Sequence, residues 1–229
     1  MSCILNIETS AEVCSVALSQ DGSLIYKDED RGRHNHAEKI GSFVDGAMSF
    51  ADNHAIPVDA VAVSSGPGSY TGLRIGVSMA KGLCYGRGMK LVSVPTLDLL
   101  CVPVLLGGEI SEDALLCPML DAKRMEVYAK LVDRSLAEVR ETAADIVDED
   151  TYLEWLKQGP VWFFGPGAGK CKEAINHPNA VFVDGIGPLA ENMFPLAEQR
   201  LARGIVEDVA YFVPQYLKDF DAKLPKPLI

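Results

Sequence analysis

Short apolar runs separated by polar turns open the chain and predict strands. Three runs lie at Ser2 to Ile7, Val13 to Ser19 and Leu24 to Lys27, and the Asp21-Gly22 step before the last run favours a hairpin. Apolar residues then recur at three- and four-residue steps, which predicts a helix from about Asn35 to Asn53. The opening segment therefore predicts three strands followed by a helix.

The rest of the first half continues with strands and helices in alternation. The apolar run Ala60 to Val63 is followed by the glycine-rich string SSGPGSYTGLRIG. A helix is predicted from about Thr71 to Tyr85, then a strand at Leu91 to Val94 and a short helix from Thr96. The complete order is three strands, helix, strand, helix, with a last strand and helix closing the half.

The second half repeats this order, which predicts a duplicated fold. Its elements are predicted at Leu115 to Leu120, Val127 to Val132 and about Glu138 to Ile146 (strands), Thr151 to Lys157 (helix), Val161 to Phe164 (strand), a helix after the second glycine loop at 165–169, Ala180 to Val183 (strand) and Leu189 to Ala202 (helix). Two βββαβα halves are typical of the ribonuclease H-like fold of the actin-like ATPase and sugar kinase superfamily. We expect domains at 1–102 and 103–229, with the last helix able to pack back on the first half.

Charge and cysteine usage narrow the functional classes. The formal net charge is −11 and the pI is near 4.8. Such a surface repels phosphate backbones, so direct RNA binding by this chain alone is disfavoured. The six cysteines are scattered without a CxxC pair and are predicted to be reduced core residues. With no signal peptide or membrane span in the pattern, we expect a cytoplasmic protein.

Two functions remain open for the first glycine loop. Gly66, Gly68 and Gly72 precede a helix N-terminus, where free N–H groups favour phosphate. The loop lacks the Gly-Lys-Ser/Thr ending of a Walker motif, however, and this favours a tight turn that only shapes the chain. The following helix carries two rows of small residues, Gly72/Gly76/Ala80/Cys84 and Ser78/Gly82/Gly86. Small residues permit close packing, either on the chain's own sheet or on a partner.

Candidate catalytic groups are sparse. A sugar-kinase-type ATPase or phosphotransferase would use Glu8, Thr9 and Ser10 after the first strand, but this segment has no glycine, and the corresponding segment at Asp121 has bulky charged residues instead. Asp121 could hold a metal, although a lone acidic residue at a strand end often caps a turn. The four histidines show no HxxxH or HExxH spacing, and no serine has a GxSxG context. We therefore expect no catalytic, cofactor-binding or metal-binding residues.

The strings ILNIETS, SSGPGSYTGLRIG, VSVPTLDLL and CPMLDAKRMEVYA together resemble the TsaB family, also called YeaZ. The resemblance implies a non-catalytic scaffold in tRNA N6-threonylcarbamoyladenosine (t6A) modification. It implies a heterodimer with a TsaD-like subunit, a homodimer when alone, recruitment of a TsaE-like ATPase through the complex, and only indirect contact with tRNA. TsaD-like relatives carry an HxxxH metal motif where Val92 to Leu100 has no histidine. An autonomous ATPase, and a glycoprotease-like peptidase, are the alternatives.

The resemblance also places the dimer surface on the two long helices of the first half. The helix spacing then gives the residues expected to contact the partner: Ile40, Val44, Ala47, Met48, Ala51, Gly72, Leu73, Gly76, Val77, Ala80 and Cys84.

Overall fold

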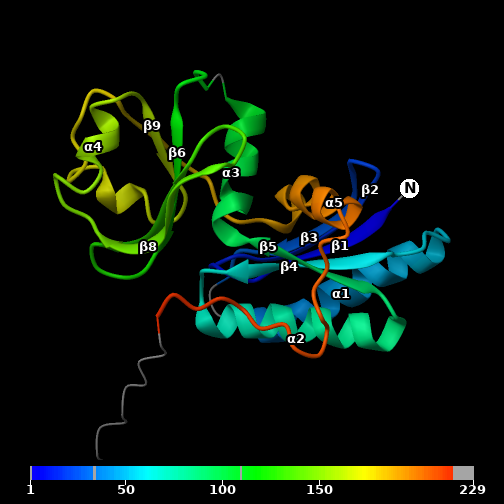
Figure 1. The fold of residues 1–229 in the computed structure, drawn as a ribbon. Helices are drawn as coiled ribbons and strands as arrows, with labels where there is room; N and C mark the ends of the chain where they lie inside the picture. Colours follow the sequence, from blue (N-terminus) through cyan, green and yellow to red (C-terminus); the bar gives the residue numbers. More distant parts are fainter. Residues whose placement is uncertain (1, 33–34, 109, 219–229) are drawn as a thin grey trace, which may run out of the picture.

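Two five-stranded mixed sheets with the same strand order form the body of the protein (Figure 1). The computed structural model describes residues 2–32, 35–108 and 110–218. The first sheet has the order β3-β2-β1-β4-β5, with bounds Cys3–Glu8 (β1), Cys14–Gln20 (β2), Ser23–Asp30 (β3), Ala60–Gly66 (β4) and Lys90–Pro95 (β5). The second has the order β8-β7-β6-β9-β10, with bounds Leu115–Asp121 (β6), Glu126–Val132 (β7), Glu138–Ile146 (β8), Val161–Phe164 (β9) and Ala180–Val183 (β10).

Strand directions confirm the predicted duplication. β1 runs antiparallel to β2 and parallel to β4, and β6 runs antiparallel to β7 and parallel to β9. This is the ribonuclease H-like arrangement, present twice. Apolar strands that are buried on both faces, such as β1 and β4, occupy the centre of the first sheet.

The helices differ more between the halves than the sequence predicts. α1 (His36–Asn53), α2 (Tyr70–Arg87) and α3 (Thr96–Gly107) follow the predictions, although α3 is longer than expected. In the second half, α4 (Leu153–Leu156) is a single turn, and the segment after the second glycine loop is a 3-10 turn. The last predicted helix divides into a 3-10 turn (Ala190–Asn192) and α5 (Phe194–Ala202), because Pro195 lacks an N–H and starts a new helix.

α1 and α2 cover one face of the first sheet, and α3 and α5 lie on the other side (Figure 1). α3 lies between the two sheets: its Leu99 packs with the core of the first sheet, while Leu97 and Leu100 pack with that of the second. Within the described ranges, none of the helices combines the length and hydropathy needed to cross a membrane.

The chain returns to the first half after the second sheet. α5 packs on β1 and β5 through Ala197, and the Ala190 amide donates to Ser15 Oγ at 2.9 Å. Beyond α5, the Glu207 amide donates to the Leu91 carbonyl of β5 at 2.8 Å. The segment from about 190 to 215 therefore lies against the first sheet, although it follows the second sheet in the sequence.

Candidate functional site

The first glycine loop is packed tightly by the chain's own backbone. Gly66 has φ +106°, and a Cβ at this position would overlap the Gln215 carbonyl oxygen. A Cβ on Gly68 would lie 2.6 Å from the Ser10 carbonyl oxygen, to which the Ser69 amide donates at 2.7 Å. The glycines therefore permit backbone-to-backbone contact, which favours a structural turn over a phosphate cradle.

The start of α2 is closed in the same way. Ser69 Oγ accepts from the Gly72 amide at 3.2 Å, so a residue of the chain already caps the helix. Thr9 Oγ1 donates to the Gly72 carbonyl at 2.8 Å, and a Cβ on Gly72 would overlap the Thr9 carbonyl oxygen. A Cβ on Gly76 would overlap Thr9 Oγ1. Gly72 and Gly76 of the first row of small residues thus permit contact between α2 and the segment after β1.

The second glycine loop repeats this geometry, as the duplication requires. Gly165 has φ +104°, and its Cβ would overlap the Met119 carbonyl oxygen of β6. A Cβ on Gly167 would lie 2.9 Å from the Leu120 carbonyl oxygen. Both Gly-Pro-Gly segments therefore pack against the end of the neighbouring central strand or the residues that follow it.

The acidic residues that a kinase-like site would use are occupied by other parts of the chain. Glu8 is buried and accepts from the Ser10 amide at 2.5 Å and from the Ser64 hydroxyl. Asp121 forms an ion pair with Lys170, whose ammonium also donates to the Glu126 carbonyl at 2.7 Å. Across the described part of the chain, no group of three or more His, Cys, Asp or Glu side chains is arranged to hold a metal.

Burial of Glu8 predicts a pH-dependent stability that can be measured. Burial raises the pKa of the Glu8 carboxyl above the usual value of 4.5, so the folded state holds this proton more tightly than the unfolded chain does. The resulting stabilisation is complete below the unfolded pKa and is lost as the pH rises through the folded pKa. Glu8→Gln lacks this titration, so its stability relative to the unsubstituted protein should increase as the pH rises above about 4.5, measured by urea unfolding. A difference that does not change with pH would contradict this.

The eleven residues expected to contact a partner are instead buried in the core of the first half. On α1 these are Ile40, Val44, Ala47, Met48 and Ala51, and on α2 they are Gly72, Leu73, Gly76, Val77, Ala80 and Cys84. They face the first sheet because burying the apolar stripe of each helix there stabilises the fold. A partner that docks on α1 and α2 would therefore meet mainly the side chains on their other faces; of the eleven, Ile40 also lines the groove between the two helices. Contact of these residues with a partner stays a prediction.

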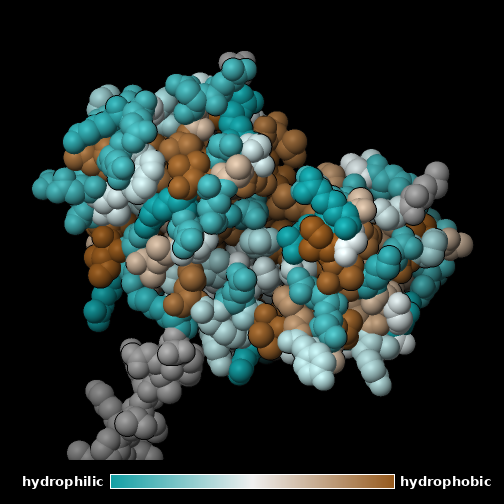
Figure 2. All heavy atoms as spheres, in the orientation of Figure 1, coloured by the Kyte–Doolittle hydropathy of each residue, from teal (hydrophilic) through white to brown (hydrophobic). Residues whose placement is uncertain are grey.

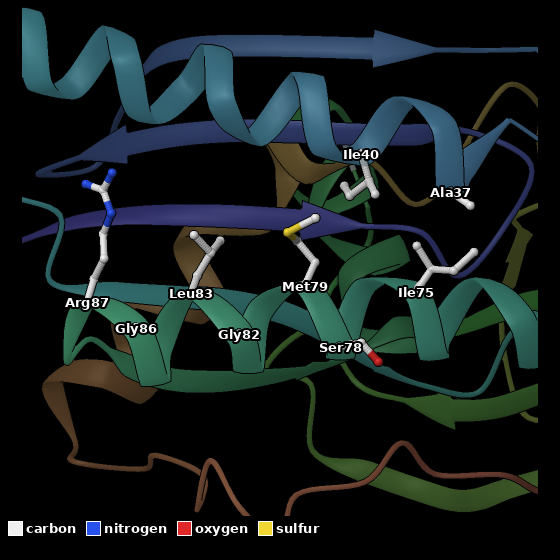
Figure 3. A pocket seen from close by; sticks show the side chains of 9 residues that line it. All are labelled: Ala37, Ile40, Ile75, Ser78, Met79, Gly82, Leu83, Gly86 and Arg87. Atoms are coloured by element: carbon white, nitrogen blue, oxygen red, sulfur yellow. The ribbon is translucent and has the colours of Figure 1, made fainter.

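An open apolar groove of about 610 Å³ lies between α1 and α2 on their outer side (Figure 3). Ile75, Met79 and Leu83 point from α2 toward α1, which contributes Ala37 and Ile40. Arg87 forms an ion pair with Asp52 at 3.5 Å, which links the two helices at one end. The groove is thus lined mainly by apolar side chains held on rigid elements.

The second row of small residues lies on this outer face. Ser78 is exposed, and no described atom lies within 4 Å of a Cβ built on Gly82 or on Gly86. Gly72 and Gly76 are therefore required by Thr9, whereas the fold places no such demand on Gly82 and Gly86. The open space above them leaves room for the backbone of another molecule.

The chain has the duplicated ribonuclease H-like fold, and both of its glycine loops are packed by its own backbone. A family model described as TsaD, tRNA N6-adenosine threonylcarbamoyltransferase, matches residues 31–161. The tRNA threonylcarbamoyladenosine biosynthesis protein TsaB of Escherichia coli K12 is 32% identical over 97% of this chain and 98% of that protein. The TsaB protein of Bacillus subtilis is 30% identical over 75% and 74%, respectively.

A solved structure agrees with these sequence matches. YeaZ from Pseudomonas aeruginosa superimposes with a TM-score of 0.79 at 25% identity, covering 95% of this chain and all of that one. The chain belongs to the TsaB (YeaZ) family.

Proposed function

We propose that this chain is a non-catalytic subunit in tRNA threonylcarbamoyladenosine biosynthesis that binds a TsaD-like subunit through the outer faces of α1 and α2. The names of its TsaB relatives support the pathway. The packed glycine loops, and the occupation of Glu8 and Asp121 by neighbouring groups, support a role without chemistry of its own.

The open space at Gly82 and Gly86 carries the proposal. A glycine inside a helix destabilises it by about 0.5–1 kcal/mol relative to alanine. Two such residues lie on one exposed face of α2, beside the apolar Ile75, Met79 and Leu83. They leave the helix surface open there, and they add no contact that stabilises the isolated chain. Close approach of a partner helix would repay this loss of stability through apolar contact.

The TsaD match supports the kind of partner. The matched residues 31–161 include α1 and α2, so a TsaD-like chain is expected to have a related pair of helices. Two such pairs can pack face to face, and the same face can pair two copies of this chain. The homodimer and the heterodimer then compete for one groove. A TsaE-like ATPase would join through the complex, and tRNA would be contacted indirectly.

Reconstitution tests this function. The purified chain, the TsaD-like subunit of the same organism and a TsaE-like ATPase are supplied with an activated threonylcarbamoyl donor, ATP and tRNA. Modified tRNA should form when all are present and should fall to background when this chain is left out. Equal modification without this chain would contradict the proposal, and so would modification by this chain in the absence of the TsaD-like subunit.

Nucleotide binding by the chain alone is a separate prediction. Because the backbone of Ser10, Met119 and Gln215 fills the space beside the glycine loops, calorimetry with Mg-ATP on the isolated chain should detect no micromolar binding. A clear isotherm with micromolar affinity would instead favour the kinase-like alternative.

A further inference from the structure

The last described segment of the chain forms a strap, residues 205–218, that is fixed along α2. Lys81 Nζ donates to the carbonyl oxygens of Ala210 and Phe212, each at 3.0 Å. Asp208 accepts from the Ala210 and Tyr211 amides at 2.7 and 3.1 Å. Val209 and Phe212 are partly buried and pack against the core of the first half. The strap is therefore held in place by hydrogen bonds and by burial, without regular secondary structure.

The residues between these anchors present large side chains to solvent. Tyr211 is 84% exposed and Val213 is 68% exposed, while Tyr85 on the adjacent face of α2 is 87% exposed. Tyrosines with a fixed backbone supply contact area at a small entropy loss, and they are enriched at binding hot spots. In Figure 2, hydrophobic and weakly hydrophilic residues reach the surface at the lower right, where Figure 1 places α2 and the strap.

This surface is continuous with the groove between α1 and α2. A second apolar groove of about 620 Å³ lies between α2 and the strap, lined by Lys81, Tyr85, Val209 and others. Gly82 lines both grooves, and because it has no side chain, α2 does not separate the two grooves at this position. A molecule that packs over Gly82 would reach Tyr85 and the strap with little change of direction.

We propose that the strap and Tyr85 form a second contact area for the same TsaD-like subunit that docks on α1 and α2. The inference rests on the proposed function, because continuity with that groove identifies the occupant. The strap also continues past α2: Gln215 N donates to the Ser65 carbonyl at 2.7 Å, and Lys218 pairs with Glu126 of β7 at 2.5 Å. The strap therefore reaches from α2 to the second half of the chain.

The test is binding of the purified TsaD-like subunit to a Tyr211→Ser/Val213→Ser double variant, measured by calorimetry. The affinity should fall about tenfold or more, because two exposed contact residues are lost. Leu106→Ser/Ile146→Ser is the matched control, since Leu106 (73% exposed) and Ile146 (74%) lie on α3 and β8. This control should bind as the unsubstituted chain does, and all variants should unfold at similar urea concentrations.

Gly82→Leu distinguishes failure of the strap inference from failure of the proposed function. If Gly82→Leu loses binding and the strap variant binds like its control, the strap inference is overturned and the groove proposal stands. If Gly82→Leu binds normally, docking on the groove between α1 and α2 is ruled out. Weak binding by the strap variant would then show a contact on the strap that is not part of one surface with the groove. A strap variant that alters only self-association also overturns the inference, because the occupant would be a second copy of this chain.

Discussion

Gly82→Leu is expected to weaken binding of the TsaD-like subunit by about 100-fold or more while leaving the isolated chain folded. The added side chain would occupy the space through which a partner helix approaches Ile75, Met79 and Leu83. It meets no described atom of this chain within 4 Å at Cβ, so the fold has room for it. Titration calorimetry gives the affinity, and circular dichroism with urea unfolding reports the fold.

Gly107→Leu is the matched control for this substitution. Gly107 also lies in a helix, and a Cβ there also meets no described atom within 4 Å, but it belongs to α3 on the other side of the first sheet. Its affinity should equal that of the unsubstituted chain. If Gly82→Leu and Gly107→Leu bind equally well, the groove is not the partner surface.

The largest effect on stability is expected from Gly72→Ala. Its single methyl group would overlap the Thr9 carbonyl oxygen. The two groups that meet are backbone, of α2 and of the segment after β1, and backbone cannot move aside as the end of a flexible side chain can. We expect a loss of about 3 kcal/mol or more in the free energy of unfolding, measured in urea.

Gly86→Ala is the contrasting substitution in the same helix. No described atom lies within 4 Å of its Cβ, and alanine favours the helix, so a gain of about 0.5–1 kcal/mol is expected. Equal effects of the two substitutions would contradict the division of α2 into an inner and an outer row of small residues.

The architecture could be predicted because its signals are local. Apolar strands, the Asp21-Gly22 hairpin step and helical spacing repeat in the same order in both halves, and the observed strand orders agree. The ends of the second half were less predictable. The single turn of α4 could not be read from the local pattern, whereas the interruption before α5 coincides with Pro195, a local signal that the predicted helix Leu189 to Ala202 did not take into account.

The sequence predicts the two helices on which the candidate partner surface lies, but not which of their side chains the fold leaves exposed. Apolar periodicity identifies the stripe of a helix that is buried against its own sheet. The residues selected by this periodicity as partner contacts are therefore buried in the first half. The two rows of small residues look alike in sequence. They differ because Thr9, 63 residues before Gly72, packs against one row only, and such a non-local contact is invisible to spacing.

The strap was not predicted for the same reason. Residues after α5 show no periodicity, and their position follows from hydrogen bonds to Lys81, Ser65 and Leu91, all more than a hundred residues earlier. The composition of this segment could have indicated that it packs on the fold. Three aromatic residues and two valines fall within 209–216, which is more apolar and aromatic content than a solvated linker usually has.

In the proposed function, the chain acts through the outer surface of α1 and α2 and performs no chemistry at its two glycine loops. The rate of threonylcarbamoyl transfer in the reconstituted complex, compared between Glu8→Gln and Gly82→Leu, tests it most directly. We expect a rate within about twofold of the unsubstituted complex for Glu8→Gln and a loss of about 100-fold for Gly82→Leu at subunit concentrations below the weakened Kd. The reverse result, with Glu8→Gln inactive although folded and Gly82→Leu fully active, would contradict it.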